Sequence, residues 1–382
     1  MTLYNIPHLE DLIFTGKDGL RDVVYYLEHL GIHLASGISD LNISTKWDGA
    51  PAIVCGEDTH GKFFVATKSA FNKQPKLIYT QEDIQGYTPN PILQEKLLTC
   101  FQYLPELNIK GVLQGDMLYT VDELRHEQST NNIIFQPNVI KYSIPFNTNL
   151  ALRVLESKMG IIFHTTHNSQ LTETSYKVDI SSLRSSKNVW YRDASLVNGI
   201  GPTVVFEDEE YDDYRQQYYT IRNFCKVIPI GVLNKFSVNE TIKRLTKRYV
   251  NDKIRKGEND LQDKDGTSFS ATGLINFTNG IFGEEIIAAK KQETKENKML
   301  KHAEIMRFFR ENYASVQIIF ELYNHIIDAK KMVIDKLNQM KDIDCGSYIP
   351  EGYVVSEKSG KVIKLVDRPV FSHANFNMER NW

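Results

Sequence analysis

The chain has 382 residues and a formal net charge of -3, and hydrophobic residues make up 41% of it. This length exceeds one typical domain of about 150 residues, and the hydrophobic content excludes an intrinsically disordered chain. Because 45 Lys and Arg nearly balance 48 Asp and Glu, the chain as a whole lacks the basic charge of many nucleic-acid-binding domains, so any such function requires a local basic patch.

The first 170 residues alternate between helical and strand-like hydrophobic spacing. Residues 9–31 have the spacing of an amphipathic helix, and Gly31 is expected to end it. Residues 91–107 have helical spacing as well. Short β-rich runs are predicted to form strands, and they lie within 40–70, 110–120, 133–145 and 158–167. This half of the chain is therefore predicted to be α+β.

After residue 185 the composition changes. An acidic run at 207–213 precedes a basic run at 243–256, and residues 284–341 have the spacing of one long helical stretch. An apolar stripe in that stretch is expected to pack in a core, and it consists of Ile319, Leu322, Ile326, Val333, Leu337 and Met340. Residues 347–371 return to a strand pattern with a tight turn at 358–360.

Four short motifs carry reactive or charged residue types. They are Lys46-Trp47-Asp48-Gly49, Gln114-Gly115-Asp116, Glu351-Gly352 and Lys364. Each is uninformative alone, and the first is also compatible with a simple polar turn, since Asp-Gly is a common turn dipeptide. In this order, however, they resemble motifs I, III, IV and V of the covalent nucleotidyltransferases, which comprise the ATP-dependent DNA and RNA ligases and the mRNA capping enzymes.

The resemblance implies an α+β fold with an antiparallel-sheet nucleotidyltransferase core, like the ATP-grasp-like adenylation domain of ligases, and a large helical insertion. The implied division is a first core part at 1–185, a mainly helical module at 186–345 and a second core part at 346–382. The early motifs fall in the first part, and the motifs around Glu351 and Lys364 fall in the last.

The family attaches a nucleotide to the lysine of motif I, so the resemblance implies that Lys46 is the nucleophile, with Asp48 beside it. An amine attacks phosphorus only when it is unprotonated, which requires a pKa below the ordinary value of about 10.4. Lys364 is implied to bind the α-phosphate and to lower the pKa of Lys46 by its charge. Thr45 and Gly49 are expected to contact the nucleotide, because Gly49 allows close backbone approach.

Other residues match the family's phosphate, ribose and metal positions. Lys68 and Ser69 match motif Ia, where a cation would hold a phosphate. Asp116 stands where the family usually has a glutamate that contacts the ribose. Glu351 is implied to hold a divalent cation, Mg²⁺ or Mn²⁺, and Asp116 is a second candidate metal ligand.

The family also has an aromatic residue that stacks on the nucleobase, about twenty residues after motif III. At that distance the resemblance implies Tyr142, with Phe163 in reserve; a core position is the alternative for either. His164 and His167 have no third ligand near them in the sequence, so a metal site there is not expected. The second lysine of motif V is replaced by Val366.

These matches predict an ATP-dependent polynucleotide ligase that forms a lysyl-AMP intermediate. RNA is favoured over DNA because the 18 residues after Lys364 leave no room for the OB-fold domain that DNA ligases carry there. One alternative is a nucleotidyltransferase with another acceptor, such as an RNA end, a protein or a small molecule. Another is a catalytically inactive nucleic-acid-binding relative, which Val366 and Asp116 favour.

Location and nucleic-acid contacts follow from other features. In the basic run, Lys243, Arg244, Lys247 and Arg248 are candidate nucleic-acid contacts beside Tyr249, the alternative being a solvated helix face. The phrases KWDGAPA and KMGIIFHT resemble tailed-bacteriophage proteins, which implies a host-cell cytoplasm. No apolar segment of membrane-spanning length occurs, and no membrane partner is expected. Reduced thiols are expected at all four cysteines, Cys55, Cys100, Cys225 and Cys345.

Overall fold

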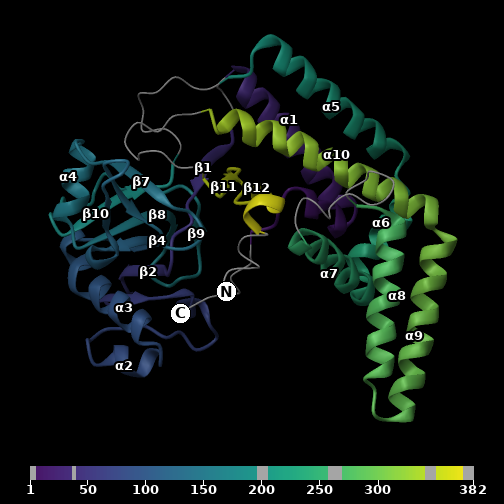
Figure 1. Cartoon of the computed structure of the whole chain (residues 1–382), viewed down its shortest axis with the longest axis horizontal. Coiled ribbons are helices and arrows are strands. Elements are labelled where there is room, and N and C mark those ends of the chain that lie inside the picture. The colour runs from purple at the N-terminus through teal and green to yellow at the C-terminus, as the bar shows by residue number, and fades with distance from the viewer. Residues whose placement is uncertain (1–5, 37–39, 196–204, 257–268, 340–349, 373–382) are drawn as a thin grey trace.

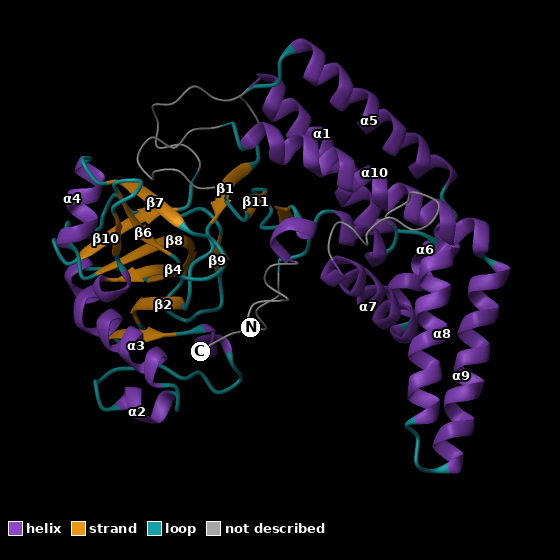
Figure 2. Cartoon of the chain, viewed as in Figure 1, coloured by secondary structure: helices purple, strands orange, loops and turns teal. Residues whose placement is uncertain are grey.

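A computed structural model describes residues 6–36, 40–195, 205–256, 269–339 and 350–372. The protein is α+β, as the sequence predicts, and its strands form mainly antiparallel sheets. Figures 1 and 2 show an arch whose two sides are a β-rich part and a helical part. Across the described residues, no helix has the length and hydrophobicity needed to cross a bilayer.

Three sheets carry the strands. The largest has the order β10-β8-β4-β2-β3, with β9 paired to β8, and among its described pairs only β10 with β8 is parallel. The two smaller sheets have the orders β1-β11-β12 and β5-β6-β7. The strands are β1 (Asn42–Lys46), β2 (Ala52–Glu57), β3 (Phe63–Ala66), β4 (Val112–Thr120), β5 (Arg125–Glu127), β6 (Asn132–Phe135), β7 (Tyr142–Pro145), β8 (Met159–His167), β9 (Thr174–Ser175), β10 (Val189–Asp193), β11 (Gly352–Ser356) and β12 (Val362–Val366).

The helices divide between the two sides of the arch. Helices α2, α3 and α4 accompany the large sheet, whereas α1 and α5 to α10 pack together on the other side (Figure 1). The helices are α1 (Lys17–Ser36), α2 (Asp83–Tyr87), α3 (Pro91–Tyr103), α4 (Asn149–Glu156), α5 (Asp208–Val227), α6 (Ile230–Val238), α7 (Glu240–Lys256), α8 (Ala271–Ile287), α9 (Gln292–Glu311) and α10 (Tyr313–Leu337).

The prediction that Gly31 ends the first helix is wrong. A short 3-10 turn, η1 (Glu10–Thr15), precedes α1, and α1 continues through Gly31 to Ser36. A Cβ at this position would lie 2.7 Å from the ring of Tyr214 in α5, so the glycine permits close packing of two helices. Gly31 therefore serves the packing of α1 against α5 and does not end the helix.

The single long helix expected at 284–341 is also wrong, because the chain turns at 288–291 and again at Asn312 to give α8, α9 and α10. The expectation for the apolar stripe is confirmed: its described members are at most 1% exposed and join the core, namely Ile319, Leu322, Ile326, Val333 and Leu337. Met340 lies outside the described residues.

The small sheet β1-β11-β12 joins the two sides of the arch. Strand β1 pairs with β11, so Lys46 lies opposite Gly352. Tyr353 and Ile363 of this sheet belong to the same hydrophobic core as the helices. The N-terminal segment lies along β12, where the Lys364 N–H donates to the Pro7 carbonyl at 2.9 Å. Segments from both ends of the sequence therefore meet at Lys46.

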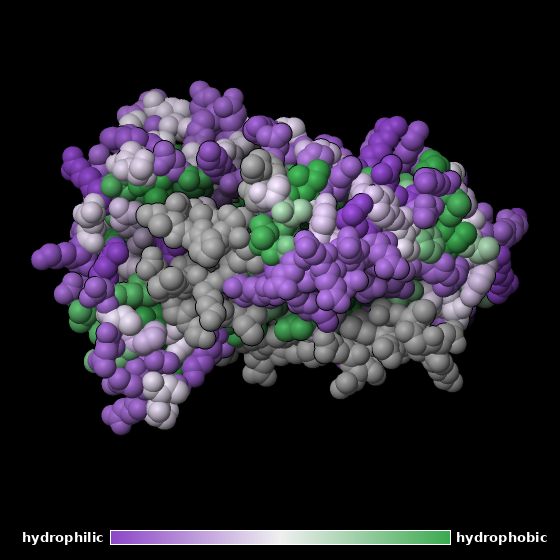
Figure 3. Space-filling model, turned by 90° about the horizontal axis from the view of Figure 1, so that it is seen from above, coloured by the Kyte–Doolittle hydropathy of each residue, from purple (hydrophilic) through white to green (hydrophobic). Residues whose placement is uncertain are grey.

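The C-terminal turn forms where the sequence predicts it, with the Gly360 N–H donating to the Glu357 carbonyl at 3.0 Å. The strand expected at 133–145 is instead the hairpin β6–β7. Cys55, Cys100 and Cys225 are free thiols, and Cys345 lies outside the described residues. Figure 3, which shows the molecule from above, has mostly hydrophilic side chains on this face, with small groups of hydrophobic residues between them.

Candidate functional site

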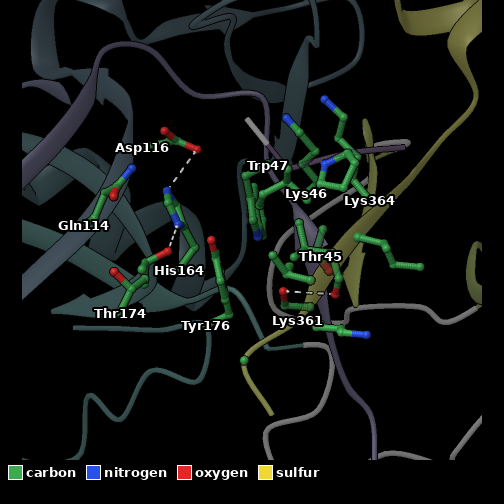
Figure 4. Close-up of a pocket in the computed structure, with 18 of the residues that line it drawn as sticks. Thr45, Lys46, Trp47, Gln114, Asp116, His164, Thr174, Tyr176, Lys361 and Lys364 are labelled. Atoms are coloured by element: carbon green, nitrogen blue, oxygen red, sulfur yellow. Dashed lines mark hydrogen bonds and ion pairs between the residues drawn. The ribbon is translucent and has the colours of Figure 1, made fainter. Parts of the chain in front are cut away.

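A cavity of about 700 Å³ lies between the large sheet and the sheet β1-β11-β12. Its two walls differ in chemistry, as Figure 4 shows. The large sheet contributes polar side chains, among them Gln114, Asp116 and His164. The opposite wall carries the amines of Lys46 on β1 and Lys364 on β12, which are the two outer strands of the small sheet.

A second cavity of about 710 Å³ adjoins the first. Both cavities are lined by the same five residues, Lys46, Trp47, Lys68, Asp116 and Lys364. Asp48, Gly49 and Glu351 line only the second cavity, where Asn251 of α7 and Arg368 also reach it. The Lys46 amine therefore lies at the junction of two spaces, each large enough for a small ligand.

Three of the predicted residues form a charged cluster around this junction. The Lys46 amine forms a short ion pair with Glu351. Burial raises the pKa of the Glu351 carboxyl, and the positive charge of Lys46 partly opposes that rise. Burial also lowers the pKa of Lys364, and repulsion from Lys46 adds to the effect. The structure thus brings together Lys46, Glu351 and Lys364, which the sequence resemblance matches to motifs I, IV and V.

Asp48 is buried and holds the loop between β6 and β7. Its carboxylate accepts hydrogen bonds from the Asn138 side chain at 2.6 Å and from the backbone N–H groups of Val139 and Ile140 at 2.6 and 2.8 Å. The Asp48 N–H in turn donates to the Tyr142 hydroxyl at 2.9 Å. These contacts fix the residues that follow Lys46.

The structure places Tyr142 in the core, contrary to its predicted role as a base-stacking residue. Its ring is 1% exposed, lies between Trp47 and Phe135 at centroid distances of 5.5 and 5.2 Å, and lines neither cavity. The reserve residue, Phe163, is 0% exposed. The aromatic residue that does line both cavities is Trp47, which the motif pattern passed over because the family allows any residue there.

The remaining nucleotide-site predictions divide. Thr45 lines the first cavity, and Lys68 is exposed and lines both. Gly49 lines the second cavity, and a Cβ there would lie 2.7 Å from the Cβ of Asp116, so the close approach requires glycine. Ser69 is not brought to either cavity, because its hydroxyl forms a short hydrogen bond with Tyr87.

Next to the predicted residue Asp116, further polar side chains on β4 and β8 were not predicted as part of the site, namely Gln114, His164 and His167. His164 lies 3.6 Å from the Asp116 carboxylate, and both line the first cavity. His167 lies 3.1 Å from Gln114 Oε1 through Nε2 and 3.0 Å from Thr174 Oγ1 through Nδ1. Burial lowers the pKa of His167 to about 4, and the charge of nearby His164 adds to the effect. The sequence signal was the short spacing of the two histidines.

Glu351 and Asp116 are the two predicted ligands of a divalent cation. Glu351 and Asp116 both line the second cavity, and carboxylate oxygens are the ligands that Mg²⁺ and Mn²⁺ prefer. Among the residues described, no group of three or more His, Cys, Asp or Glu side chains could hold a metal alone. Ions that keep waters and bind substrate phosphates need only one or two protein carboxylates.

The family's second motif V lysine has no direct replacement at its own position. Val366 is 1% exposed and lines neither cavity. Lys361 lines the first cavity, and its amine binds Asp22 of α1 at 2.6 Å. Arg368 lines the second cavity, where its guanidinium binds Asp11 at 3.0 Å and Asn251 at 2.9 Å.

The basic run forms an exposed face of α7. Lys243, Arg244, Lys247 and Arg248 are all exposed, while Tyr249 is 2% exposed and belongs to the helical core. Tyr249 is therefore not placed to contact a nucleic acid together with them.

Residues 5–380 match the model of DUF6267, a family of unknown function. The chain belongs to this family. Comparison with curated proteins and with solved structures finds no match. The arrangement of side chains around Lys46 is thus the basis for assigning a function to this DUF6267 protein.

Proposed function

We propose that the protein is an ATP-dependent polynucleotide ligase, acting on RNA in preference to DNA, with Lys46 as the residue that carries AMP. The observation that carries the proposal is the place of the Lys46 amine, at the junction of two cavities and beside Glu351 and Lys364. A nucleophile between two binding spaces can take a nucleotide from a ligand in one space and pass it to an acceptor in the other.

In the first step, the Lys46 nitrogen bonds to the α-phosphorus of ATP, and the bond from that phosphorus to pyrophosphate breaks. AMP then passes to the 5′-phosphate of a strand, and a 3′-hydroxyl displaces AMP to form the phosphodiester. Lys364 and Lys68 line both cavities, and in this proposal they bind phosphate oxygens. Glu351 and Asp116 would hold the divalent cation, Mg²⁺ or Mn²⁺, which neutralises phosphate charge when bound.

The decisive experiment is incubation of the protein with α-labelled ATP and Mg²⁺. The wild-type chain should become labelled, and Lys46→Arg should not, because an arginine remains protonated and cannot attack phosphorus. Lys110→Arg is the matched control, since Lys110 is 64% exposed and pairs with Glu57 outside both cavities, so its label should persist. An unlabelled wild-type chain would refute the proposal. Repeating the assay with each labelled nucleoside triphosphate identifies the base preference.

Two observations favour a second candidate, a catalytically inactive relative that binds nucleic acid. Val366 is buried where the family has a phosphate-binding lysine, and Ser69 lies outside both cavities. Retention of biological activity by Lys46→Ala would support this candidate. Transfer of label to an acceptor without strand joining would instead indicate a nucleotidyltransferase with a different acceptor.

A further inference from the structure

Helix α7 reaches the second cavity near its C-terminal end and extends from there into the helical side of the arch. Asn251, near the C-terminal end of α7, lines the second cavity together with Lys46 and Lys364. The Asn251 side chain also accepts a hydrogen bond from Arg368 at 2.9 Å. Figure 1 shows α7 on the inner side of the arch, and the C-terminal turn that carries Arg368 packs against it.

The helical spacing places the basic residues on the same face of α7 as Asn251. Arg248, Lys247 and Arg244 precede Asn251 by three, four and seven residues, which are the intervals at which helix residues share a face. The buried residues of α7 form the opposite face, and they include Leu245 and Val250. A basic face therefore leads away from the second cavity along the helix.

This face keeps a surplus of positive charge, although the exposed Glu240 lies 3.5 Å from Lys243. Glu285 of α8 lies 3.2 Å from Arg244, 3.7 Å from Arg248 and 2.9 Å from Lys298 of α9, so one carboxylate is shared among three cations. Arg244 and Lys298 also line a groove of about 300 Å³ with a further lysine, Lys301. The positive charge thus extends from α7 onto α9.

We infer that α7 guides a single strand of nucleic acid whose 5′-phosphate end sits in the second cavity. The placement of the 5′ end, and not the 3′ end, in the second cavity rests on the proposed function, because Lys46 would transfer AMP to the 5′-phosphate. The eight helical steps from Lys243 to Asn251 span about 12 Å, the length of about three to four stacked nucleotides. Because Tyr249 is buried, the face offers charge to phosphates, and recognition along it is independent of base sequence.

The test is binding of a 12-nucleotide, 5′-phosphorylated RNA with a 3′ fluorophore, measured by anisotropy from about 50 to 200 mM salt. Lys243→Glu combined with Lys247→Glu leaves the contacts of Glu285 intact. Loss of two phosphate contacts should weaken binding about 10-fold or more at the lowest salt and reduce the slope of log affinity against log salt by about 1.4.

The matched control carries the same charge change at exposed lysines elsewhere, Lys187→Glu before β10 combined with Lys226→Glu in α5. It should bind like the wild type. An equal loss in the two double variants, or no loss in the α7 variant, would overturn the inference.

A probe with a 5′-hydroxyl tests where the strand end lies. Its binding to the wild type should be weaker than that of the phosphorylated probe, and equal binding would overturn the placement of the 5′-phosphate in the second cavity. Failure of the proposed function can be told apart from failure of this inference. An unlabelled wild-type chain in the ATP assay would refute the ligase, whereas the role of α7 is decided by the difference in RNA binding between the two double variants.

Discussion

At the scale of single residues, His167 shows how burial sets chemistry in the wall of the first cavity. Gln114 Oε1 can only accept a hydrogen bond, so the neutral His167 imidazole donates to it from Nε2. The Thr174 hydroxyl then donates a hydrogen bond to Nδ1 of the same ring. The neutral ring satisfies both partners. Protonation would place an uncompensated charge in a site where burial lowers the pKa to about 4 from 6.5.

The expected consequence is a loss of stability in acid. Because the unfolded chain takes up the proton near pH 6.5 and the folded chain only near pH 4, the contribution of His167 is fully present above pH 6.5 and is lost as the pH falls through 4. The loss amounts to about 3 kcal/mol. Urea unfolding at several pH values should show a flatter profile for His167→Gln, and an unchanged profile would contradict this account.

The same scale shows what the motifs could and could not predict. Lys46, Glu351 and Lys364 meet as the resemblance to nucleotidyltransferases implies, because that pattern of motifs brings charged residues from separate segments to one place. The pattern says nothing about Trp47, whose position in the motif is variable. Whether Tyr142 faces a ligand or the core depends on the ring of Phe135 and on the loop held by Asp48, and both contacts arise only in the folded chain.

At the scale of elements, one buried ion pair joins the N-terminal turn η1 to α10. Lys330 binds Glu10 at 2.7 Å, with side-chain exposures of 4% and 1%. Lys330→Met should lower the free energy of unfolding by about 3 kcal/mol, at the lower end for a broken buried pair, because the buried Glu10 carboxylate then keeps only the more distant Arg368 guanidinium at 3.7 Å. Adding Glu10→Gln should recover much of that loss, since the incompletely paired charge is then removed. Urea unfolding of the two single variants and the double variant measures the coupling.

The control for this pair is Lys358→Met, which removes an ion pair with Asp40 whose side chains are 81% and 68% exposed. It should leave the unfolding midpoint unchanged, because surface pairs contribute little. If Lys330→Met and Lys358→Met had the same effect, burial of the first pair would have no energetic role.

Helix existence could be predicted from the sequence, but helix ends could not. Residues 288–291 are two alanines and two lysines, all good helix formers, so local propensity favours continuing the helix where α8 in fact ends. Packing of α9 back along α8 decides otherwise. At Gly31 the error is the reverse, because the sequence predicts a helix end where α1 in fact continues. The small size of this glycine is needed for the contact with Tyr214.

At the scale of the whole molecule, the site exists because distant segments meet. Strand β1 pairs with β11 over a sequence separation that includes all the helices from α2 to α10. Hydrophobic spacing shows that each helix has an apolar face, but it does not identify the partner of that face. The association of α1 with α5 and α10, which places the small sheet against the helical core, therefore could not be read from the sequence.

Because the first cavity is lined by both the large and the small sheet, a ligand bound there stabilises the two sides of the arch against separation. ATP with Mg²⁺ should raise the melting temperature in proportion to the logarithm of its concentration, with a stabilisation of about 2.7 kcal/mol at a hundredfold excess over Kd. Lys364→Met should remove most of this shift, since it deletes a cation from both cavities. Lys358→Met, on the exposed turn before β12, should retain the shift. A shift of equal size in the two variants would mean that the nucleotide binds outside the cavities around Lys46.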